Sequence, residues 1–258
     1  MTRFLSFLGT RMIWAMTHLG AFGQMVYEII RMLPRIRSYW SLMIGQMIEI
    51  GIRSLPIVLI ISFFAGMVTS VQTGYQFQAY VPLYLVGSVV CESVILELAP
   101  VLGALVLSGR VGATIAAEIG TMRVTEQLDA MEVMALDPII HLAIPRILAG
   151  MVMLPILVVF SDLIGILSGM FVAVTTMDVT TVEFVKGMRE LFRTKDAYFG
   201  LVKATCFGLV ITLVACYQGF KVPIGSGAEG VGAATTNTVV VSCLSILVMD
   251  YLLARTLL

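Results

Sequence analysis

The sequence predicts an all-α integral membrane protein, and three observations carry that prediction. Hydrophobic residues make up 59% of the 258 positions and charged residues only 12%, against about 25% charged residues in soluble domains. The mean hydropathy is +1.00. Several uncharged stretches exceed the roughly 20 residues that a helix needs to cross a membrane. So low a charged fraction excludes a soluble enzyme and a disordered chain. Because the 16 basic and 16 acidic residues cancel, no net field attracts nucleic acid, and a DNA-binding protein is excluded as well.

The amino-terminal segment, residues 1–52, is expected to lie at the membrane interface. Apolar residues recur at spacings of three and four through residues 3–32, with polar residues on the other side, which is typical of an interfacial amphipathic helix. Trp14, Tyr39 and Trp40 suit the depth of the lipid headgroups. The pattern favours an interfacial elbow helix over a sixth span, which remains the alternative.

Five spans are predicted in a transmembrane core that covers residues 53–258. The stretch from Ser54 to Cys91 holds 38 consecutive uncharged residues, too many for one crossing, and polar residues from Gln72 to Pro82 divide it. The third apolar stretch contains only Asp162 as a charge, so it is either one long tilted helix or a helix with an extension. The predicted spans cover roughly 53–72, 83–108, 147–177, 198–219 and 237–255.

The orientation follows from the lysines and arginines of the connections. With the amino terminus in the cytoplasm, these residues divide ten to six in favour of the cytoplasmic side, with Lys203 counted on the outer side. The turn at 72–82 carries no positive charge. The amino terminus is therefore predicted inside and the carboxyl terminus outside.

Two short helices are predicted in the connections. In the cytoplasmic segment, Glu126, Asp129 and Glu132 lie three residues apart within a helical pattern at 125–134, with Leu128, Met131 and Ala135 as an apolar edge. Such a helix suits a groove of a soluble partner, although an ordinary solvated helix has the same composition. On the outer side, Thr180 and Glu183 have capping-box spacing before a helix near 181–193, either a lid over the spans or a partner contact.

No residue pattern indicates catalysis, a metal or a cofactor in this chain. Gly225, Gly227 and Gly230 match the dinucleotide fingerprint, but they follow a membrane span and no βαβ unit surrounds them, so a flexible loop is predicted. A phosphate-binding GxxxxGK[ST] loop is absent from the sequence. The four cysteines lack ligand spacing and are expected to be buried free thiols.

Carboxylates inside the predicted spans are the strongest functional signal. An ionisable group near mid-membrane costs about 2.5–3.5 kcal/mol on insertion scales, so it normally faces protein or a watery cavity. Glu97 is favoured for function at roughly two to one over a structural hydrogen bond. For Glu92 and Asp162 the two interpretations are closer to even.

At these residues the sequence resembles the MlaE permease family over nearly its whole length. The resemblance is carried by ELAP at 97–100, SGRVGA at 108–113, AEIGTMRVTEQLDAM at 117–131, and Asp137-Pro138. It extends to GMV at 66–68 and ATT at 234–236. One position departs from the family pattern: many relatives carry a polar or basic residue where Leu96 stands, so no adjacent ion-pair partner for Glu97 is expected.

The resemblance implies one permease domain over residues 1–258, with an elbow helix, five spans and a coupling helix after the second span. It implies the permease subunit of an ABC transporter that moves glycerophospholipids between the inner and outer membranes of a Gram-negative cell and so maintains lipid asymmetry. The implied partners are a second copy of the chain, cytoplasmic ATPase subunits that carry ATP and magnesium, and a periplasmic ring of MCE-domain proteins. No nucleic-acid partner is expected.

Two sets of site residues follow from the residues and the resemblance together. An apolar wall with a few polar groups suits a phospholipid, and the expected lipid-binding residues are Met67, Val68, Val71, Gln72, Tyr75, Phe77 and Glu97. The expected ATPase-coupling residues are Glu118, Arg123, Glu126, Asp129 and Glu132. The rival function is an ion- or proton-coupled secondary transporter using Glu97 and Asp162, although no internal repeat is found. A purely structural anchor is the third possibility.

Overall fold

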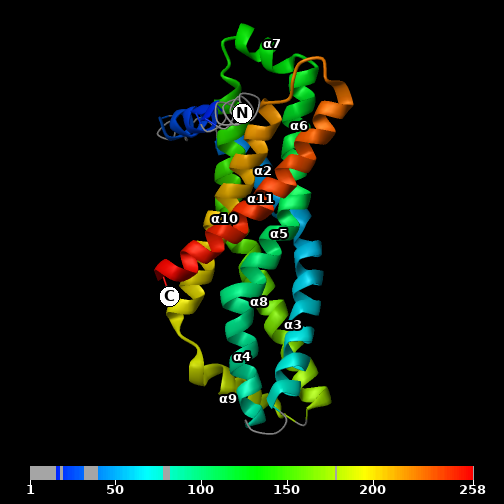
Figure 1. The fold of residues 1–258 in the computed structure, drawn as a ribbon. Helices are drawn as coiled ribbons and strands as arrows, with labels where there is room; N and C mark the ends of the chain where they lie inside the picture. Colours follow the sequence, from blue (N-terminus) through cyan, green and yellow to red (C-terminus); the bar gives the residue numbers. More distant parts are fainter. Residues whose placement is uncertain (1–15, 18–19, 32–39, 78–81, 178, 258) are drawn as a thin grey trace, which may run out of the picture.

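The protein is a long bundle of helices in the computed structural model (Figure 1). The structure describes residues 16–17, 20–31, 40–77, 82–177 and 179–257. Five helical stretches within these residues are long and apolar enough to cross a membrane, which confirms the predicted class and number of spans. Every span is longer than predicted. The five stretches are Trp40–Phe77, Val86–Val124, Ile139–Thr176, Thr194–Phe220 and Gly227–Thr256.

The first span begins well before the predicted residue 53. It consists of α2 (Trp40–Ile50), the short η2 (Ile52–Ser54) and α3 (Leu55–Phe77). Glu49 is the one charge before residue 53 in this stretch, and it pairs with Arg53 one turn later at 2.7 Å. Met43 and Ile50 are buried in the main core. The expected boundary at residue 52 therefore falls inside a continuous helical stretch that belongs to the bundle.

The second span continues beyond its predicted end at residue 108. After η3 (Leu83–Leu85), it alternates α-helical and π-helical turns without a break. The charged residues past position 108 are tolerated because they have partners: Glu118, for example, pairs with Arg146 at 2.8 Å. The segments are α4 (Val86–Ser93), η4 (Val94–Leu102), α5 (Gly103–Leu107), η5 (Ser108–Gly112) and α6 (Ala113–Val124), of which η4 and η5 are π-helical.

The predicted cytoplasmic helix forms as α7 (Gln127–Val133), shorter than the expected 125–134. The chain reverses direction at Glu126, whose φ of 58° lies in the left-handed region. After α7 the chain enters the π-helical η6 (Ile139–Ala143) and then α8 (Ile144–Thr176). In Figure 1, α7 lies beyond the bundle, at the end opposite α9 (Thr181–Leu191).

The predicted outer helix forms at the opposite end as α9 (Thr181–Leu191), two residues shorter than expected. Its capping box is confirmed in both directions between Thr180 and Glu183. The hydrogen bonds from the Thr180 backbone and side chain hold the pKa of the Glu183 carboxyl below its usual value. α9 lies so close to η3 (Leu83–Leu85) that a Cβ on Gly187 would overlap the Tyr84 carbonyl.

The last two spans are α10 (Thr194–Phe220) and α11 (Gly227–Leu257), which pack against each other and against α6. Gly225 and Gly227 have φ of 85° and 56° in the turn between them, a conformation that glycine adopts without strain. The loop predicted at 225–230 is wrong from Gly227 onward, where α11 begins. The glycine motif connects two helices, so it is not a dinucleotide fingerprint.

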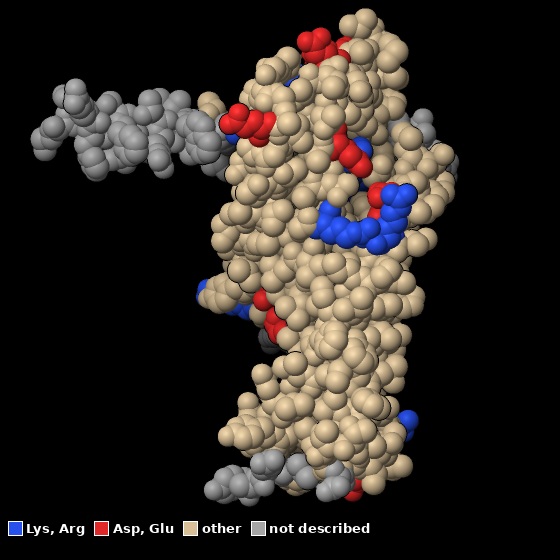
Figure 2. All heavy atoms as spheres, turned by 90° about the vertical axis from the view of Figure 1, so that its right-hand side faces the viewer, with Lys and Arg blue, Asp and Glu red and all other residues tan. Residues whose placement is uncertain are grey.

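Small residues set a close and extensive contact between α3 and α8 (Figure 1). A Cβ on Gly66 would overlap the Gly165 carbonyl, and the buried Ser62 and Ser161 hydroxyls share a short hydrogen bond. Stripes of this kind let membrane helices approach closely where no hydrophobic force drives them together. The outward surface is largely apolar, and its charged atoms gather mostly toward the α7 end (Figure 2).

The described part of the amino-terminal segment, residues 16–17 and 20–31, is helical and is called here the amino-terminal helix. Met25 and Ile29 are buried, and the Phe22 ring packs edge-on against Tyr217 of α10 at 5.4 Å. The helix extends sideways from the α7 end of the bundle (Figure 1). Its interfacial position stays a prediction, and Trp14 and Tyr39 lie outside the described residues.

Candidate functional site

The expected lipid-binding residues of the first span lie on the outer half of α3, but Phe77, at the end of the helix, packs against the buried cluster that includes Val86 and Val90. Val68, Val71 and Tyr75 expose about half or more of their surface, at 52%, 51% and 77%. Gln72 is also exposed, while Met67 and Phe77 are half-buried. The opposite side of α3 carries the small residues that contact α8. The α3 face is therefore an open apolar surface with a polar fringe toward the α9 end.

Glu97 lies on η4, where the helix departs from α-helical geometry around a proline. Pro100 has no N–H, so it cannot donate to the Leu96 carbonyl four residues earlier. The ammonium of Lys203 donates to that carbonyl instead, at 3.0 Å. π-helical segments are rare and are frequently found at functional sites.

A buried cation from α10 is the ion-pair partner of Glu97. The side chain of Lys203 is completely buried and lies 2.9 Å from Glu97 Oε1, whose side chain is 47% exposed. Asp250 of α11 contacts the same ammonium at 2.5 Å. The expectation drawn from Leu96 concerned an adjacent partner only, and the partner comes instead from another span, α10. We call Glu97, Lys203 and Asp250 the charged cluster.

The charged cluster joins three spans and does not balance its own charge. One ammonium faces two carboxylates, so with all three groups ionised it carries a net charge of −1. Ionisable groups inside membrane spans generally pair with each other or face a cavity, and the exposed part of Glu97 opens away from Lys203. The arrangement can hold η4, α10 and α11 together and present one carboxylate to a polar ligand.

Sequence reasoning missed two of these three residues. Lys203 was counted among outer-side loop charges, although it lies inside α10 and is buried. Asp250 lies in the predicted fifth span and was not singled out. Both residues carry a signal that sequence analysis can detect. A charged residue within an apolar span indicates function for Lys203 and Asp250 as it does for Glu97 and Asp162.

Asp162 on α8 is not part of the charged cluster. Its Oδ1 is buried without a hydrogen-bond partner among the described residues. Among the residues that the structure describes, no hydrogen bond or ion pair connects Asp162 or Glu92 with Glu97. An ion relay through Glu97 and Asp162 is therefore not favoured.

The expected ATPase-coupling residues divide into paired and exposed groups. Glu118 pairs with Arg146, and Arg123 pairs with Asp129 at 2.7 Å, which ties α6 to α7. Glu126 and Glu132 are exposed. Of the three carboxylates expected on the acidic side of the helix, Glu126 and Glu132 face solvent. The third, Asp129, is paired with Arg123 of the same chain.

The apolar edge expected beside these carboxylates also differs. Leu128 is 3% exposed and belongs to the main core, and Ala135 lies beyond the end of α7 with a φ of 60°. Exposed apolar side chains follow α7 instead: Val133 is 88% exposed and Met134 62%. The outer surface around α7 is thus an apolar tip flanked by Glu126 and Glu132.

The four cysteines are free. Cys91 and Cys216 are buried, while Cys206 and Cys243 are half-buried. The Cys243 thiol lies 3.1 Å from the Ser108 hydroxyl of η5, so it packs as a weakly polar core residue.

Five apolar spans around a charged cluster, with an amphipathic helix and a protruding short helix at one end, define a multi-pass α-helical membrane protein of the permease type. The chain belongs to the MlaE permease family, because the family model described as Permease MlaE matches residues 43–256.

Named relatives cover nearly the whole chain. A probable ABC transporter permease protein of Rickettsia felis is 39% identical over 96% of this chain and 95% of its own length. The intermembrane phospholipid transport system permease protein MlaE of Haemophilus influenzae is 36% identical, over 97% of this chain and 95% of its own. The chloroplast protein trigalactosyldiacylglycerol 1 of Arabidopsis thaliana is 31% identical over 90% of this chain and 65% of its own.

Proposed function

We propose that this chain is the permease subunit of an ATP-driven ABC transporter that moves glycerophospholipids between the inner and outer membranes of a Gram-negative cell. The family match over residues 43–256 carries the proposal. A relative named for intermembrane phospholipid transport, which aligns with 97% of this chain, supports the substrate class. Binding and hydrolysis of ATP with magnesium then belong to separate cytoplasmic ATPase subunits, and this chain is a transport subunit without catalysis of its own.

The proposed assembly is a homodimer in the inner membrane, bound to ATPase subunits on one side and to a ring of MCE-domain proteins on the other. The amino terminus and α7 lie on the cytoplasmic side, and α9 lies on the periplasmic side. Five crossings, an odd number, support the carboxyl terminus on the periplasmic side. The amino-terminal helix lies in the cytoplasmic interface, as its sideways direction suggests (Figure 1).

In this assembly, the acyl chains of the lipid lie against the exposed face of α3. Met67, Val68, Val71 and Phe77 supply the apolar wall, and Gln72 and Tyr75 lie at its periplasmic mouth. A second copy of the same face opposite the first encloses the lipid. Glu97 supplies a polar contact whose position is fixed by Lys203, because the ammonium holds the carboxylate at 2.9 Å.

A bulky side chain at Val71 tests this lipid position. Val71 is 51% exposed, so Val71→Trp fits the folded chain and takes up the space proposed for the acyl chains. We expect lipid transfer to fall at least tenfold while the complex assembles normally, measured by transfer between vesicles that contain the complex. Val152→Trp, on the 42% exposed outer side of α8, is the matched control and keeps transfer. If the Val71→Trp complex transfers lipid at the wild-type rate, the lipid binds somewhere other than this face of α3.

The surface of α7 is the proposed contact with the ATPase. Val133 and Met134 enter an apolar groove, and Glu126 faces basic residues at its rim, in the manner of a helix docked into a groove. Asp129 is not part of this contact, because it holds Arg123.

Reversing the exposed Glu126 carboxylate tests that contact. We expect Glu126→Lys to release the ATPase subunit from the purified permease, since an attraction becomes a repulsion. Co-purification measures the loss, and insertion in the membrane is checked in parallel. Glu190→Lys, at an exposed carboxylate of α9, is expected to leave the complex intact. Retained ATPase in the Glu126→Lys variant contradicts the assignment.

A further inference from the structure

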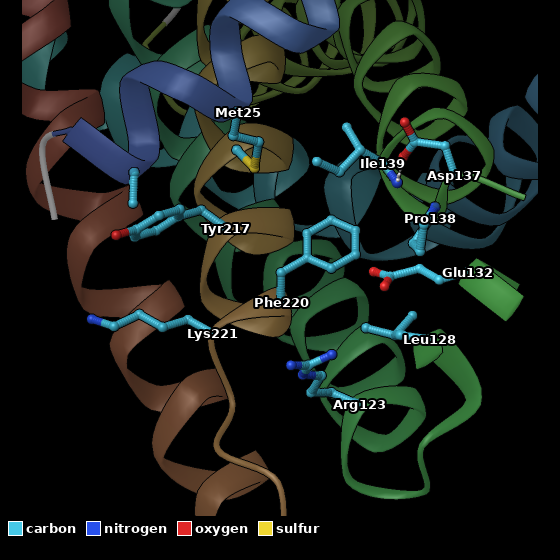
Figure 3. A pocket seen from close by; sticks show the side chains of 11 residues that line it. Met25, Arg123, Leu128, Glu132, Asp137, Pro138, Ile139, Tyr217, Phe220 and Lys221 are labelled. Carbon is cyan, nitrogen blue, oxygen red and sulfur yellow. Dashed lines mark hydrogen bonds between the residues drawn. The ribbon is translucent and has the colours of Figure 1, made fainter. Parts of the chain in front are cut away.

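A cavity of about 410 Å³ lies at the cytoplasmic end of the bundle, apart from the α3 face and the charged cluster. It is an open hollow that lies between the amino-terminal helix, α7, the start of η6 and the end of α10 (Figure 3). Met25, Leu128 and Phe220 supply apolar side chains, of which Met25 and Leu128 are buried. Its size lies within the range of small-molecule sites.

Two cations and two carboxylates line this cavity: Arg123, Lys221, Glu132 and Asp137. The Asp137 carboxylate accepts a hydrogen bond from the Ile139 backbone, and the Lys221 ammonium lies over the Tyr217 ring.

Arg123 and Glu132 do not pair with each other within the described residues. Arg123 uses Nη1 for Asp129, and its other N–H groups have no acceptor among the described residues. Glu132 is exposed, and within the described chain no hydrogen bond or ion pair involves its carboxylate. Both side chains border the same hollow around Phe220 (Figure 3). A ligand that carries an anion and a cation can satisfy both groups at once.

The cavity lies where the apolar part of α10 ends. Phe220 is the last residue of that span, and Lys221 follows it directly. The amino-terminal helix, which forms one wall, packs its Phe22 ring on Tyr217 one turn below. The apolar floor of the cavity continues into a membrane span, as an acyl chain requires. The charged rim lies at the end of that span, where a lipid headgroup lies at the membrane surface.

We propose that this cavity binds a zwitterionic glycerophospholipid of the cytoplasmic leaflet, with its phosphate on Arg123 and a primary ammonium on Glu132. Charge-assisted hydrogen bonds from the guanidinium to the phosphate and from the ammonium to the carboxylate are the strong contacts. Part of an acyl chain lies against Met25 and Phe220. This lipid is a resident one that joins the amino-terminal helix to α7, so the proposal goes beyond the transported cargo.

Site-specific photo-crosslinking tests this proposal on the full chain, purified without partner proteins. A photo-reactive amino acid replaces Ala21, an exposed residue of the cavity wall, or Val71 on α3. Each protein is placed in vesicles of equal parts phosphatidylethanolamine, phosphatidylglycerol and phosphatidylcholine, and captured lipids are identified by mass. At position 21 we expect phosphatidylethanolamine to exceed each other lipid about tenfold, the factor of one charge-assisted hydrogen bond.

The variant Glu132→Gln removes the charge that selects the ammonium. In this variant, we expect the lipids captured at position 21 to have the same proportions as the lipids of the vesicles. The lipids captured at position 71 are expected to stay as in the wild type. Glu190→Gln on α9 is the matched control and keeps the preference at position 21. Because capture at position 71 reports on the proposed cargo site, failure at one position is distinguishable from failure at the other.

Two results overturn the proposal. One is capture of lipids at position 21, in a chain with Glu132 intact, in the proportions of the vesicles. The other is complete displacement of the captured lipid by free phosphoethanolamine, which assigns the cavity to a soluble ligand.

Discussion

Replacing Lys203 by methionine is expected to destabilise the folded chain by about 3–5 kcal/mol, the range for removing one partner of a buried ion pair. The side chain of Lys203 is completely buried between Glu97 and Asp250. Without the ammonium, two carboxylates repel each other inside the spans and the Leu96 carbonyl loses its donor. The measurement is thermal unfolding of the purified protein in detergent, together with the amount of folded protein in the membrane.

A compensated variant separates the structural role of the cluster from its role in transport. Lys203→Met with Asp250→Asn removes one charge of each sign and leaves Glu97, whose side chain is 47% exposed. We expect this variant to recover most of the lost stability, since a neutral pair no longer requires a cation. Transport is expected to stay impaired, because Glu97 is no longer held in place. A stable, fully active Lys203→Met protein contradicts both expectations.

The spans were predictable from the sequence, but their ends were not. Uncharged stretches much longer than 20 residues indicate crossings whatever the neighbours are, so the count of five is correct. The ends depend on contacts between distant residues. The charges after residue 108 predicted the end of the second span there, yet α6 continues because Glu118 pairs with Arg146, 28 positions later. A linear pattern contains no information about that partner.

The candidate site was predicted in part, for the same physical reason. Glu97 was identified because a carboxylate inside an apolar span is costly and therefore informative. Lys203 was counted among the outer-side charges although the predicted fourth span, which begins at residue 198, contains it. The three-residue spacing of Glu126, Asp129 and Glu132 gave a common side of a helix. The spacing could not show that the left-handed turn at Glu126 brings the Asp129 carboxylate to Arg123.

Gly66→Leu is expected to separate α3 from α8 and to abolish transport. The atom that would be overlapped by a Cβ at Gly66 is the backbone carbonyl of Gly165, which cannot rotate away as a side chain can. Packing of small residues is the main attraction between membrane helices, so a leucine at the closest point removes it. The hydrogen bond between Ser62 and Ser161, one turn away on each helix, is lost with the contact.

Disulfide trapping reports directly on this helix pair. With Ser62→Cys and Ser161→Cys in an otherwise unchanged chain, we expect rapid crosslinking under mild oxidation, because the two hydroxyls are hydrogen-bonded. Adding Gly66→Leu is expected to reduce that crosslinking by at least tenfold. Gly45→Leu is the matched control on the same span, since nothing lies within 4 Å of a Cβ there, and it should leave crosslinking and transport unchanged. Crosslinking of the Gly66→Leu protein at the original rate would show that α3 and α8 accommodate the leucine, and the close contact would then not be what positions the α3 face.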